Sequence, residues 1–367
     1  MRVLMISSHH MGGRYFEDFA RGAIGSEIKL GFMWLSKDEP TKWIKEYEVR
    51  DLSNRFLASR SFILQCLGGI NAIYNFKPDI IQTHLFRAGI LGILVGKLMG
   101  KPVILTRHHI TEHVEVGSKL HRTLDRYSAR IANFIIVFSS AAQKWLVEIE
   151  GIDPKKISVI NQGFDFQKLS PTPEEIFNAR RLLGFTGETF NIVCIARYSE
   201  TKGQRYLVEA IRELVSFIPE IRLVFVGPGE SEWLAQIVKD FGLNDFIRLA
   251  GYNHDVPACL AAADLVVHPS LVDAFSQLLI EAQGVGAPLI ATDIAAAREQ
   301  IVDGVTGIIV EERNSSQLAA AINRLYLDRG LMAELGLNAS KSVQERFSVG
   351  RMIKESQDCY RVVVSRD

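Results

Sequence analysis

Short apolar runs rich in β-branched residues alternate with amphipathic stretches along the whole chain, and this alternation constrains the fold more than any other feature. An apolar run of strand length followed by a helical stretch is typical of a βαβ unit, and successive units build a parallel sheet. Parallel strands are covered on both faces, so they should be continuously apolar, as these runs are. The sequence therefore predicts an α/β protein.

The predicted strands form two series with a turn-rich segment between them. The first series is Arg2–Ser7, Ile80–Thr83, Pro102–Thr106, Phe134–Phe138 and Ile157–Ile160, and the second is Asn191–Ala196, Arg222–Val226, Ile247–Leu249, Leu265–His268, Pro288–Ala291 and Gly307–Val310. The segment 161–187, rich in glycine and proline, separates them and predicts a linker. A length of 367 residues suits two domains. We predict domains over 1–168 and 169–345, and a C-terminal helix over 346–367 that packs back on the first domain.

The composition excludes several classes of protein. Lys plus Arg equals Asp plus Glu at 42 each, which argues against a protein that coats nucleic acid. The four cysteines are far apart and form no pair typical of a zinc site or a disulfide framework, so they suit a reducing cytoplasm. No secretory signal is visible. The most apolar stretch, 88–100, is too short for the roughly 20 residues of a membrane span.

The segment Pro269–Glu281 combines two carboxylates with a helix N-terminus. Asp273 is predicted in the loop after a strand and Glu281 about one turn into the next helix. Carboxylates hold vicinal sugar hydroxyls by charge-assisted hydrogen bonds. The amides between them, unpaired at a helix N-terminus, would bind an anion, and they belong to Phe275, Ser276 and Gln277. The alternative is structural, with Asp273 as a helix cap and Glu281 as an ordinary helical residue.

Two cations follow the first strand of the second series. Arg197 can bind phosphate oxygens with two parallel hydrogen bonds, and Lys202 supplies a compact charge. A diphosphate leaving group gains negative charge as its bond breaks, so fixed cations beside it lower the barrier. The alternative is that both are solvated loop residues.

These segments resemble the family 4 glycosyltransferases. The resemblance rests on IARYSETKGQ (195–204), VGPGE (226–230) and PSLVDAFSQLLIEAQGVGAPLIATD (269–293), in which the two acids keep the family's spacing of eight residues. It implies the GT-B fold, in which two Rossmann-like parallel-sheet domains face a cleft. The second domain would bind the nucleotide sugar and the first the acceptor.

The resemblance also implies a role for each matching residue. Arg197 and Lys202 would bind the donor diphosphate, Glu281 the ribose hydroxyls, and Asp273 the hydroxyls of the transferred sugar. Asp273 replaces the usual glutamate, which shortens its reach by one methylene. Ala274 and Ser276 replace glycines that allow close backbone approach to the donor.

The first domain offers paired glycines and histidines. Gly12 and Gly13 match a family loop that lies against the donor phosphate and the acceptor, although an ordinary tight turn is the alternative. His108 matches a family histidine that contacts the transferred sugar, and His109 takes that role if the register differs by one. His84 ends the preceding predicted strand and is a candidate for the acceptor side, with a structural role as the alternative.

The resemblance implies a retaining, hexosyltransferase-like enzyme that moves a sugar from a UDP- or GDP-sugar to an acceptor hydroxyl, in polysaccharide, glycan or glycolipid biosynthesis. The acceptor would be a saccharide, a lipid-linked sugar or a small molecule. Because no DxD motif or ligand cluster is visible, we predict no metal, and no cofactor besides the donor substrate. The alternatives are a non-catalytic sugar-nucleotide-binding protein and a nucleotide-sugar epimerase on the same fold.

The stretch 119–130 has basic residues at helical spacing. Such a face can contact anionic lipid, which would place a cytoplasmic protein at the inner face of the membrane. A solvated helix is the alternative, and the formal net charge of zero favours it.

Overall fold

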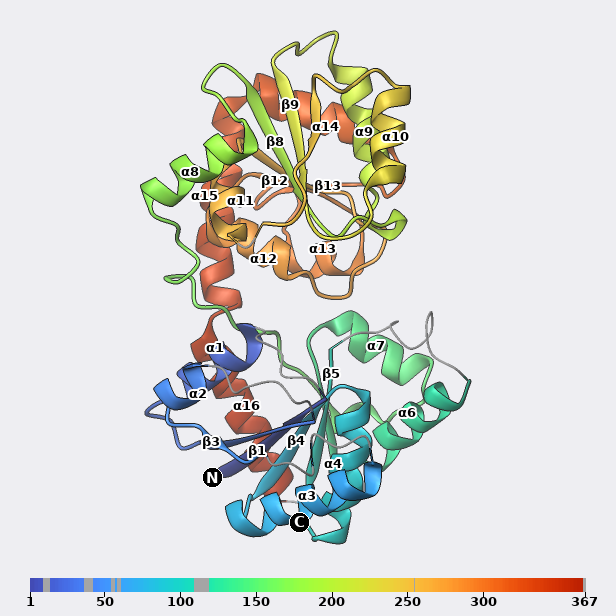
Figure 1. Cartoon of the computed structure of the whole chain (residues 1–367), viewed down its shortest axis with the longest axis vertical. Coiled ribbons are helices and arrows are strands. Elements are labelled where there is room, and N and C mark those ends of the chain that lie inside the picture. The colour runs from blue at the N-terminus through green and yellow to red at the C-terminus, as the bar shows by residue number, and fades with distance from the viewer. Residues whose placement is uncertain are drawn as a thin grey trace. The chain divides into compact units, whose positions relative to one another are not determined.

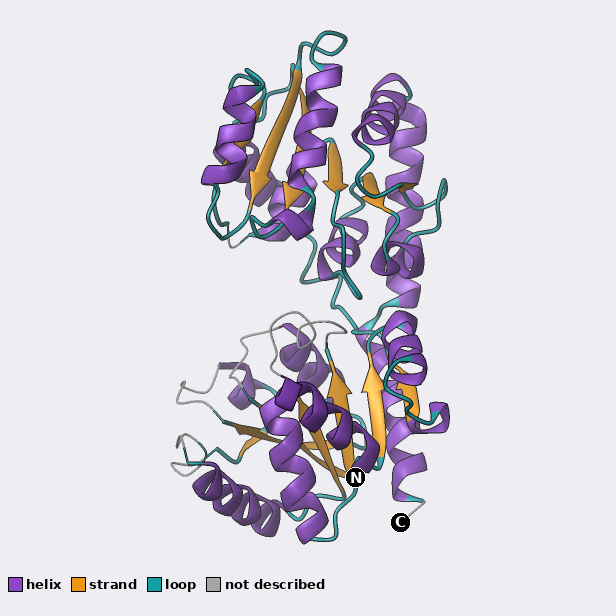
Figure 2. Cartoon of the chain, turned by 90° about the vertical axis from the view of Figure 1, so that its right-hand side faces the viewer, coloured by secondary structure: helices purple, strands orange, loops and turns teal. Residues whose placement is uncertain are grey.

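The structure, a computed structural model, describes residues 1–8, 14–35, 42–53, 57, 61–108, 119–253 and 255–365. They form two compact units, in which unit 1 contains 1–164 and 347–367 and unit 2 contains 165–346 (Figure 1). Each unit is built on one parallel sheet with helices packed on its faces (Figure 2). The chain therefore leaves unit 1 once and returns to it at its end.

The sheet of unit 1 has seven parallel strands in the order β3-β2-β1-β4-β5-β6-β7. They are β1 (Arg2–Ser7), β2 (Lys29–Trp34), β3 (Arg50–Asp51), β4 (Ile80–His84), β5 (Val103–Arg107), β6 (Phe134–Val137) and β7 (Ile157–Val159). The five strands predicted here are confirmed, but β2 and β3 were not predicted. Gly31 interrupts the apolar run of β2, and a Cβ there would lie 2.9 Å from Leu52 and 3.0 Å from the ring of Phe76.

Helices cover both faces of this sheet. They are α1 (Arg14–Ala23), α2 (Lys42–Glu46), α3 (Phe62–Phe76), α4 (Phe86–Leu98), α6 (Lys119–Ile131), α7 (Ser140–Glu148), the short 3-10 helix η1 (Pro154–Lys156) and α16 (Val349–Val364). Neighbouring residues of β4 point to opposite faces. Thr83 faces α4, where a Cβ on Gly92 would clash with the Thr83 side chain. Gln82 accepts a hydrogen bond from Tyr360 of α16.

The sheet of unit 2 has six parallel strands in the order β10-β9-β8-β11-β12-β13. They are β8 (Phe190–Ile195), β9 (Ile221–Val226), β10 (Ile247–Leu249), β11 (Leu265–His268), β12 (Leu289–Thr292) and β13 (Ile308–Val310), which confirms all six predicted strands. Its helices are α8 (Pro173–Leu183), the 3-10 helix η2 (Glu200–Lys202), α9 (Gln204–Leu214), α10 (Glu232–Asp240), α11 (Val256–Ala262), α12 (Gln277–Gly284), α13 (Ala295–Gln300), α14 (Ser315–Leu327) and α15 (Arg329–Arg346). Alternate residues of β8 enter two separate cores, with Ile192 in one and Val193 in the other.

The segment predicted as a linker is not all loop. Residues 173–183 of this segment form α8, which begins with a capping box formed by Thr172 and Glu175. The chain leaves unit 1 earlier, after Phe164, whose amide donates to the carbonyl oxygen of Phe347 over 2.8 Å. The outgoing and returning segments of unit 1 thus pair with each other.

Candidate active site

The candidate site of unit 2 lies where β8, β9 and β11 end. The carboxyl ends of parallel strands share one edge of a sheet, and ligands of α/β proteins bind at that edge. The loops after these strands are hydrogen-bonded to one another. Leu271 donates to the carbonyl oxygen of Thr201 over 2.9 Å, and Tyr198 donates to that of Pro228 over 2.9 Å. Three segments distant in sequence therefore form one surface.

Two glycines allow these loops to approach so closely. Gly203 has a φ of +65°, and a Cβ there would lie 1.9 Å from the carbonyl oxygen of Pro269. A Cβ at Gly227 would lie 1.9 Å from the carbonyl oxygen of Ala196. No other residue fits either position without moving a loop.

This packing brings Lys202 and Asp273 together. The Lys202 Nζ atom lies 3.0 Å from Asp273 Oδ2, although the residues are 71 positions apart. Their side chains are 21% and 23% exposed, so the ion pair stands at the surface of the site. The Asp273 carbonyl oxygen accepts a hydrogen bond from the Ala296 amide over 3.1 Å, which fixes its loop on α13.

Arg197 adds a second cation at the same edge. It lies two residues after the end of β8, and its side chain is exposed. Its carbonyl oxygen accepts from the Gln204 side chain over 3.0 Å, which ties its backbone to the first turn of α9. Within the described part of the chain, no acceptor hydrogen-bonds its guanidinium. The arginine is therefore open to an anion.

His268 lies beneath the ion pair and was not predicted as a site residue. It is the last residue of β11 and is buried. Burial is the main cause that lowers the pKa of His268 to about 4; the positive charge of Lys202 acts in the same direction and Asp273 opposes it. The imidazole is therefore neutral near pH 7. A polar residue that ends an apolar strand was the signal in the sequence that could have identified it.

The start of α12 differs in part from its prediction. The Ser276 amide faces the side-chain oxygen of Gln300 at 3.4 Å, and the side chain of Ser276 is buried. That amide is therefore not unpaired, and an anion bound there would have to replace Gln300 as its acceptor. Phe275 is half-buried, Gln277 is exposed, and Glu281 is buried on the second turn of the helix.

A histidine pair lies at the corresponding edge of unit 1. His84 Nδ1 is 2.9 Å from His108 Nε2, and the rings of Tyr15 and Phe16 pack against His84. Burial, aided by the nearby His108, holds the pKa of His84 well below its usual range. None of the His84 side chain is exposed, so we expect it to position the half-buried His108 rather than to touch a substrate.

Three predicted residues, Gly12, Gly13 and His109, lie outside the residues that the structure describes. Their roles stay predictions.

The whole chain is similar to solved glycosyltransferases of the GT-B fold. The structure of HepE from Anabaena in complex with UDP superposes with a TM-score of 0.83 at 22% identity, covering 99% of this chain and 100% of that chain. Sucrose-phosphate synthase from Thermosynechococcus elongatus gives 0.80 at 18% identity, covering 100% of both chains. The two parallel-sheet units are thus the two Rossmann-like domains of that fold.

Sequence relatives and family matches agree with the fold. UDP-Gal:alpha-D-GlcNAc-diphosphoundecaprenol alpha-1,3-galactosyltransferase of Escherichia coli is 25% identical over 77% of this chain and 75% of its own. A D-inositol 3-phosphate glycosyltransferase of Pseudarthrobacter chlorophenolicus is 30% identical over 73% of this chain and 67% of its own. Residues 14–168 match Glycosyltransferase Family 4 and residues 176–342 match Glycosyl transferases group 1. The chain belongs to the family 4, group 1 glycosyltransferases.

Proposed function

We propose that this protein is a retaining transferase that moves a sugar from a UDP- or GDP-sugar to an acceptor hydroxyl. The observation that carries the proposal is the 3.0 Å pair of Lys202 and Asp273 beside the exposed Arg197, at the carboxyl edge of the unit 2 sheet. The Escherichia coli relative uses a UDP-sugar by its name, and HepE is known with UDP-glucose. Both support a nucleotide diphosphate sugar as the donor.

The cations act on the leaving group. The bond between the anomeric carbon and the phosphate oxygen breaks, and its electron pair stays on the diphosphate. The acceptor oxygen bonds to the same face of that carbon, and its proton passes to the departing phosphate oxygen. Arg197 and Lys202 stabilise the charge that accumulates there, which supports a metal-independent reaction.

The carboxylates act on hydroxyl groups. Before the donor arrives, Asp273 is paired with Lys202, so donor binding exchanges that ion pair for two new contacts. Lys202 turns to the diphosphate, and the Asp273 carboxylate accepts hydrogen bonds from the sugar. Glu281, buried one turn further on, binds the ribose hydroxyls.

The acceptor side belongs to unit 1. His108, held by His84 at 2.9 Å, contacts the transferred sugar near its anomeric carbon. By analogy with the relatives, whose names include a diphosphoundecaprenol-linked sugar and inositol 3-phosphate, the acceptor is a glycan, a lipid-linked sugar or a small molecule. We place the enzyme in a polysaccharide, glycan or glycolipid pathway of the cytoplasm.

A thermal-shift screen against UDP, GDP and ADP tests the donor site. A nucleotide that binds only the folded protein raises the melting temperature. We expect UDP or GDP to do so in the wild type and in Lys239→Ala, a change at an exposed position of α10, but much less in Lys202→Ala. Absence of any shift in the wild type would count against the donor site.

A turnover assay then separates an enzyme from a binding protein. Each nucleotide sugar that shifts the melting temperature is incubated with candidate acceptors, and released nucleotide is measured. Release that depends on acceptor, with the anomeric configuration of the donor kept in the product, supports the proposal. Binding without release or transfer would favour a non-catalytic sugar-nucleotide-binding protein.

A further inference from the structure

The formal net charge of zero hides a strong division between the two units. Unit 1 has 26 Lys and Arg against 18 Asp and Glu, a formal charge of +8, and unit 2 has 16 against 24, a charge of −8. A charge asymmetry of this kind between parts of a chain is typical of proteins that meet a charged surface.

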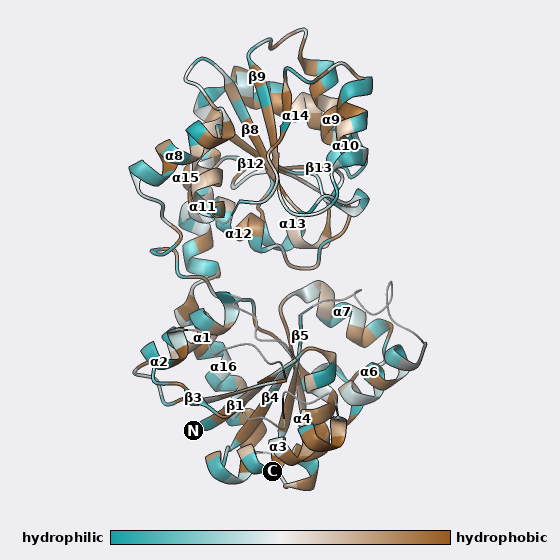
Figure 3. Cartoon of the chain, viewed as in Figure 1, coloured by the Kyte–Doolittle hydropathy of each residue, from teal (hydrophilic) through white to brown (hydrophobic). Residues whose placement is uncertain are grey.

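Helices α3, α4 and α6 form one layer in which each packs against the next. The glycines of α4, Gly89, Gly92 and Gly96, face the sheet, and Leu94 and Leu98 of the same helix are exposed. Large apolar side chains of the layer are exposed, among them Ile63, Leu67, Tyr74, Leu94, Leu98 and Tyr127. Figure 3 shows α3 and α4 mostly in hydrophobic colours.

The exposed charges on this layer all have one sign. Helix α3 contains no charged residue, and α4 contains no acidic one. The described basic side chains, all exposed, are Arg87, Lys97, Arg122, Arg126 and Arg130. The single acidic residue of the three helices, Asp125, is buried and lies 2.6 Å from Arg107.

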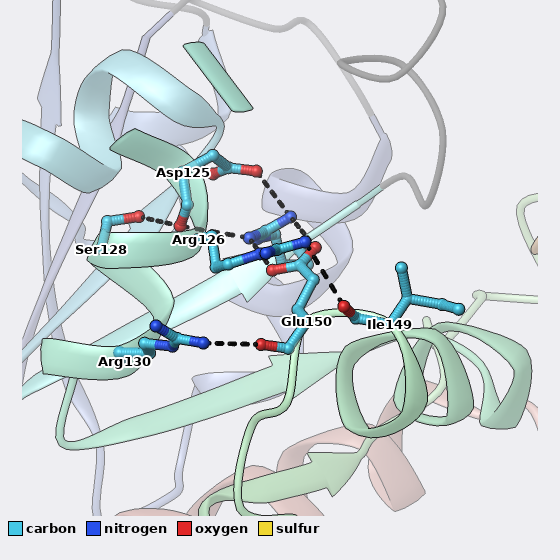
Figure 4. Close-up of polar contacts among 7 residues, drawn as sticks. Asp125, Arg126, Ser128, Arg130, Ile149 and Glu150 are labelled. Carbon is cyan, nitrogen blue, oxygen red and sulfur yellow. Dashed lines mark hydrogen bonds and ion pairs between the residues drawn. The ribbon is translucent and has the colours of Figure 1, made fainter. Parts of the chain in front are cut away.

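The arginines of α6 keep their charge available. Arg126 and Arg130 donate over 3.3 Å to the carbonyl oxygens of Ile149 and Glu150, which are neutral acceptors (Figure 4). The Glu150 carboxylate is bound to Arg107 instead, at 3.2 Å. With Arg122 and Tyr127, the two arginines line a hollow of about 560 Å³. Three guanidinium groups beside one hollow suit phosphate groups.

We propose that the outer face of α3, α4 and α6 binds the surface of an anionic lipid bilayer. Exposed apolar side chains enter the boundary between headgroups and acyl chains, and the arginines bind lipid phosphates. No helix among the residues described has the length and apolarity to cross a bilayer, so contact through a face is what this layer allows. The proposal is independent of the donor and acceptor assigned above.

The positive charge of this face argues against its binding the same face of a second copy of the protein. A symmetric dimer through this layer would bring its five cations against five identical ones, with no acidic side chain of these helices to compensate. Unit 2 of another copy, with its negative charge, is the remaining competitor, and light scattering distinguishes that association from binding to lipid.

Vesicle flotation with the full chain tests the electrostatic part. We expect binding to phosphatidylcholine vesicles that contain phosphatidylglycerol to be at least about ten-fold tighter than to phosphatidylcholine alone, and to weaken as salt is raised. Lys97→Glu/Arg122→Glu changes two exposed residues and should lower that binding at least about ten-fold. The control Lys239→Glu/Lys341→Glu makes the same charge change on unit 2 and should bind like the wild type.

A second variant tests the apolar part. Ile63→Ser/Leu98→Ser replaces side chains that are 73% and 70% exposed, so the fold should be retained, as circular dichroism will show. We expect weaker vesicle binding at high salt, where screened charges contribute little, and an unchanged thermal shift with nucleotide. Equal binding to neutral and anionic vesicles, wild-type binding by the charge-reversal variant, or an oligomer abolished by Ile63→Ser/Leu98→Ser would overturn the proposal.

Discussion

Lys202 illustrates how one side chain can have a structural partner and a proposed role in catalysis. Its side chain is 21% exposed, and its ammonium group has one ionic partner, Asp273, within 4 Å in the described structure. An ion pair this exposed contributes little to the free energy of unfolding, typically about 0–1 kcal/mol. The same charge beside a departing diphosphate stabilises a transition state, where a fixed charge has a much larger effect.

Lys202→Ala should therefore separate catalysis from stability. We expect transfer to slow by about 10²–10³-fold while the free energy of unfolding changes by about 1 kcal/mol or less. Steady-state kinetics and urea denaturation measure the two effects. Lys202→Arg, which keeps the charge, should recover part of the rate, and a Lys202→Ala enzyme with near wild-type turnover would remove this residue from the mechanism.

His268 predicts a pH dependence of stability. Its pKa is about 4 when folded and has the ordinary value of 6.5 when the chain is unfolded, so the unfolded state takes up the proton first. The stability that it contributes is complete above 6.5 and is lost as the pH falls toward 4. Between about pH 7 and pH 5, the free energy of unfolding should fall by about 2 kcal/mol from this residue alone.

The test is to compare urea denaturation at the two pH values in wild type, His268→Gln and His121→Gln. On acidification, the free energy of unfolding of His268→Gln should fall by about 2 kcal/mol less than that of the wild type. His121→Gln, at an exposed position of α6, should behave like the wild type. Equal acid sensitivity in all three would contradict the assignment.

At the residue scale, local sequence could predict that Arg197, Lys202 and Asp273 lie at one edge of a sheet, because each follows a recognisable strand at a place where strand ends meet. It could not predict that Lys202 and Asp273 pair, since that contact depends on the fit of two loops. Gln300 was missed for the same reason. It lies 24 positions from Ser276, and only the packed structure shows it occupying that amide.

Among the elements, the loop that holds Lys202 depends on the fit of Gly203 against Pro269. The carbonyl oxygen of Pro269 occupies the space that a side chain would need, and the backbone of Gly203 is left-handed. Both conditions must be met for η2 to lie against the loop after β11. The geometry of the site is therefore a property of two loops together rather than of either alone.

Gly203→Ala should disrupt this fit, and Gly242→Ala is its matched control. Both glycines have a left-handed φ, +65° and +68°, but a Cβ at Gly242 would meet nothing within 4 Å. We expect the control to cost about 1 kcal/mol of stability from backbone strain. Gly203→Ala should cost more and should also abolish the nucleotide-induced thermal shift, while equal effects of the two would show that the contact with Pro269 is unimportant.

Strands with a clear apolar pattern were predicted from the sequence, and elements whose pattern is broken were not. Long, mostly apolar strands such as Ile221–Val226 were predicted within one residue. The strand Lys29–Trp34 was not predicted because Gly31 breaks its apolar pattern, and that glycine leaves room for the side chains of Leu52 and Phe76. The linker prediction over 161–187 leaves out helix α8 because prolines and glycines flank it, although its capping box is visible in the sequence.

On the scale of the molecule, unit 1 is assembled from both ends of the chain. Helix α16 buries five apolar side chains within it, namely Met352, Ile353, Cys359, Tyr360 and Val363. At about 1.5–3 kcal/mol for each buried side chain, this helix contributes on the order of 10 kcal/mol. That is comparable with the whole stability of an average domain.

Removal of residues 347–367 should therefore unfold unit 1 and leave unit 2 folded. Hydrogen exchange measured by mass spectrometry should show loss of protection in β1, β4 and β5 with protection retained in β8, β9 and β11. The nucleotide-induced thermal shift should persist if the donor site belongs to unit 2 alone. Retained protection in β4 would contradict the importance given to α16.

The net charge of the whole chain says little about how the charge is distributed. The net charge of zero favoured a solvated α6, but the structure divides that total into +8 and −8. The predicted domains, 1–168 with 346–367 against 169–345, divide the charge in nearly the same way, so the boundaries read from the sequence carried information that the total did not.

The return of the chain to unit 1 also sets an order of assembly during translation. A ribosome produces every residue of unit 2 before it produces α16, so the face of β4 that Tyr360 covers stays bare until the last stretch emerges. Although domains usually fold as they appear, amino-terminal first, here the second-born unit can finish before the first-born one. A nascent chain of this protein thus carries the apolar strands of unit 1 without their covering helix while the whole of unit 2 is made, and this is the stage at which a chaperone would have most to protect.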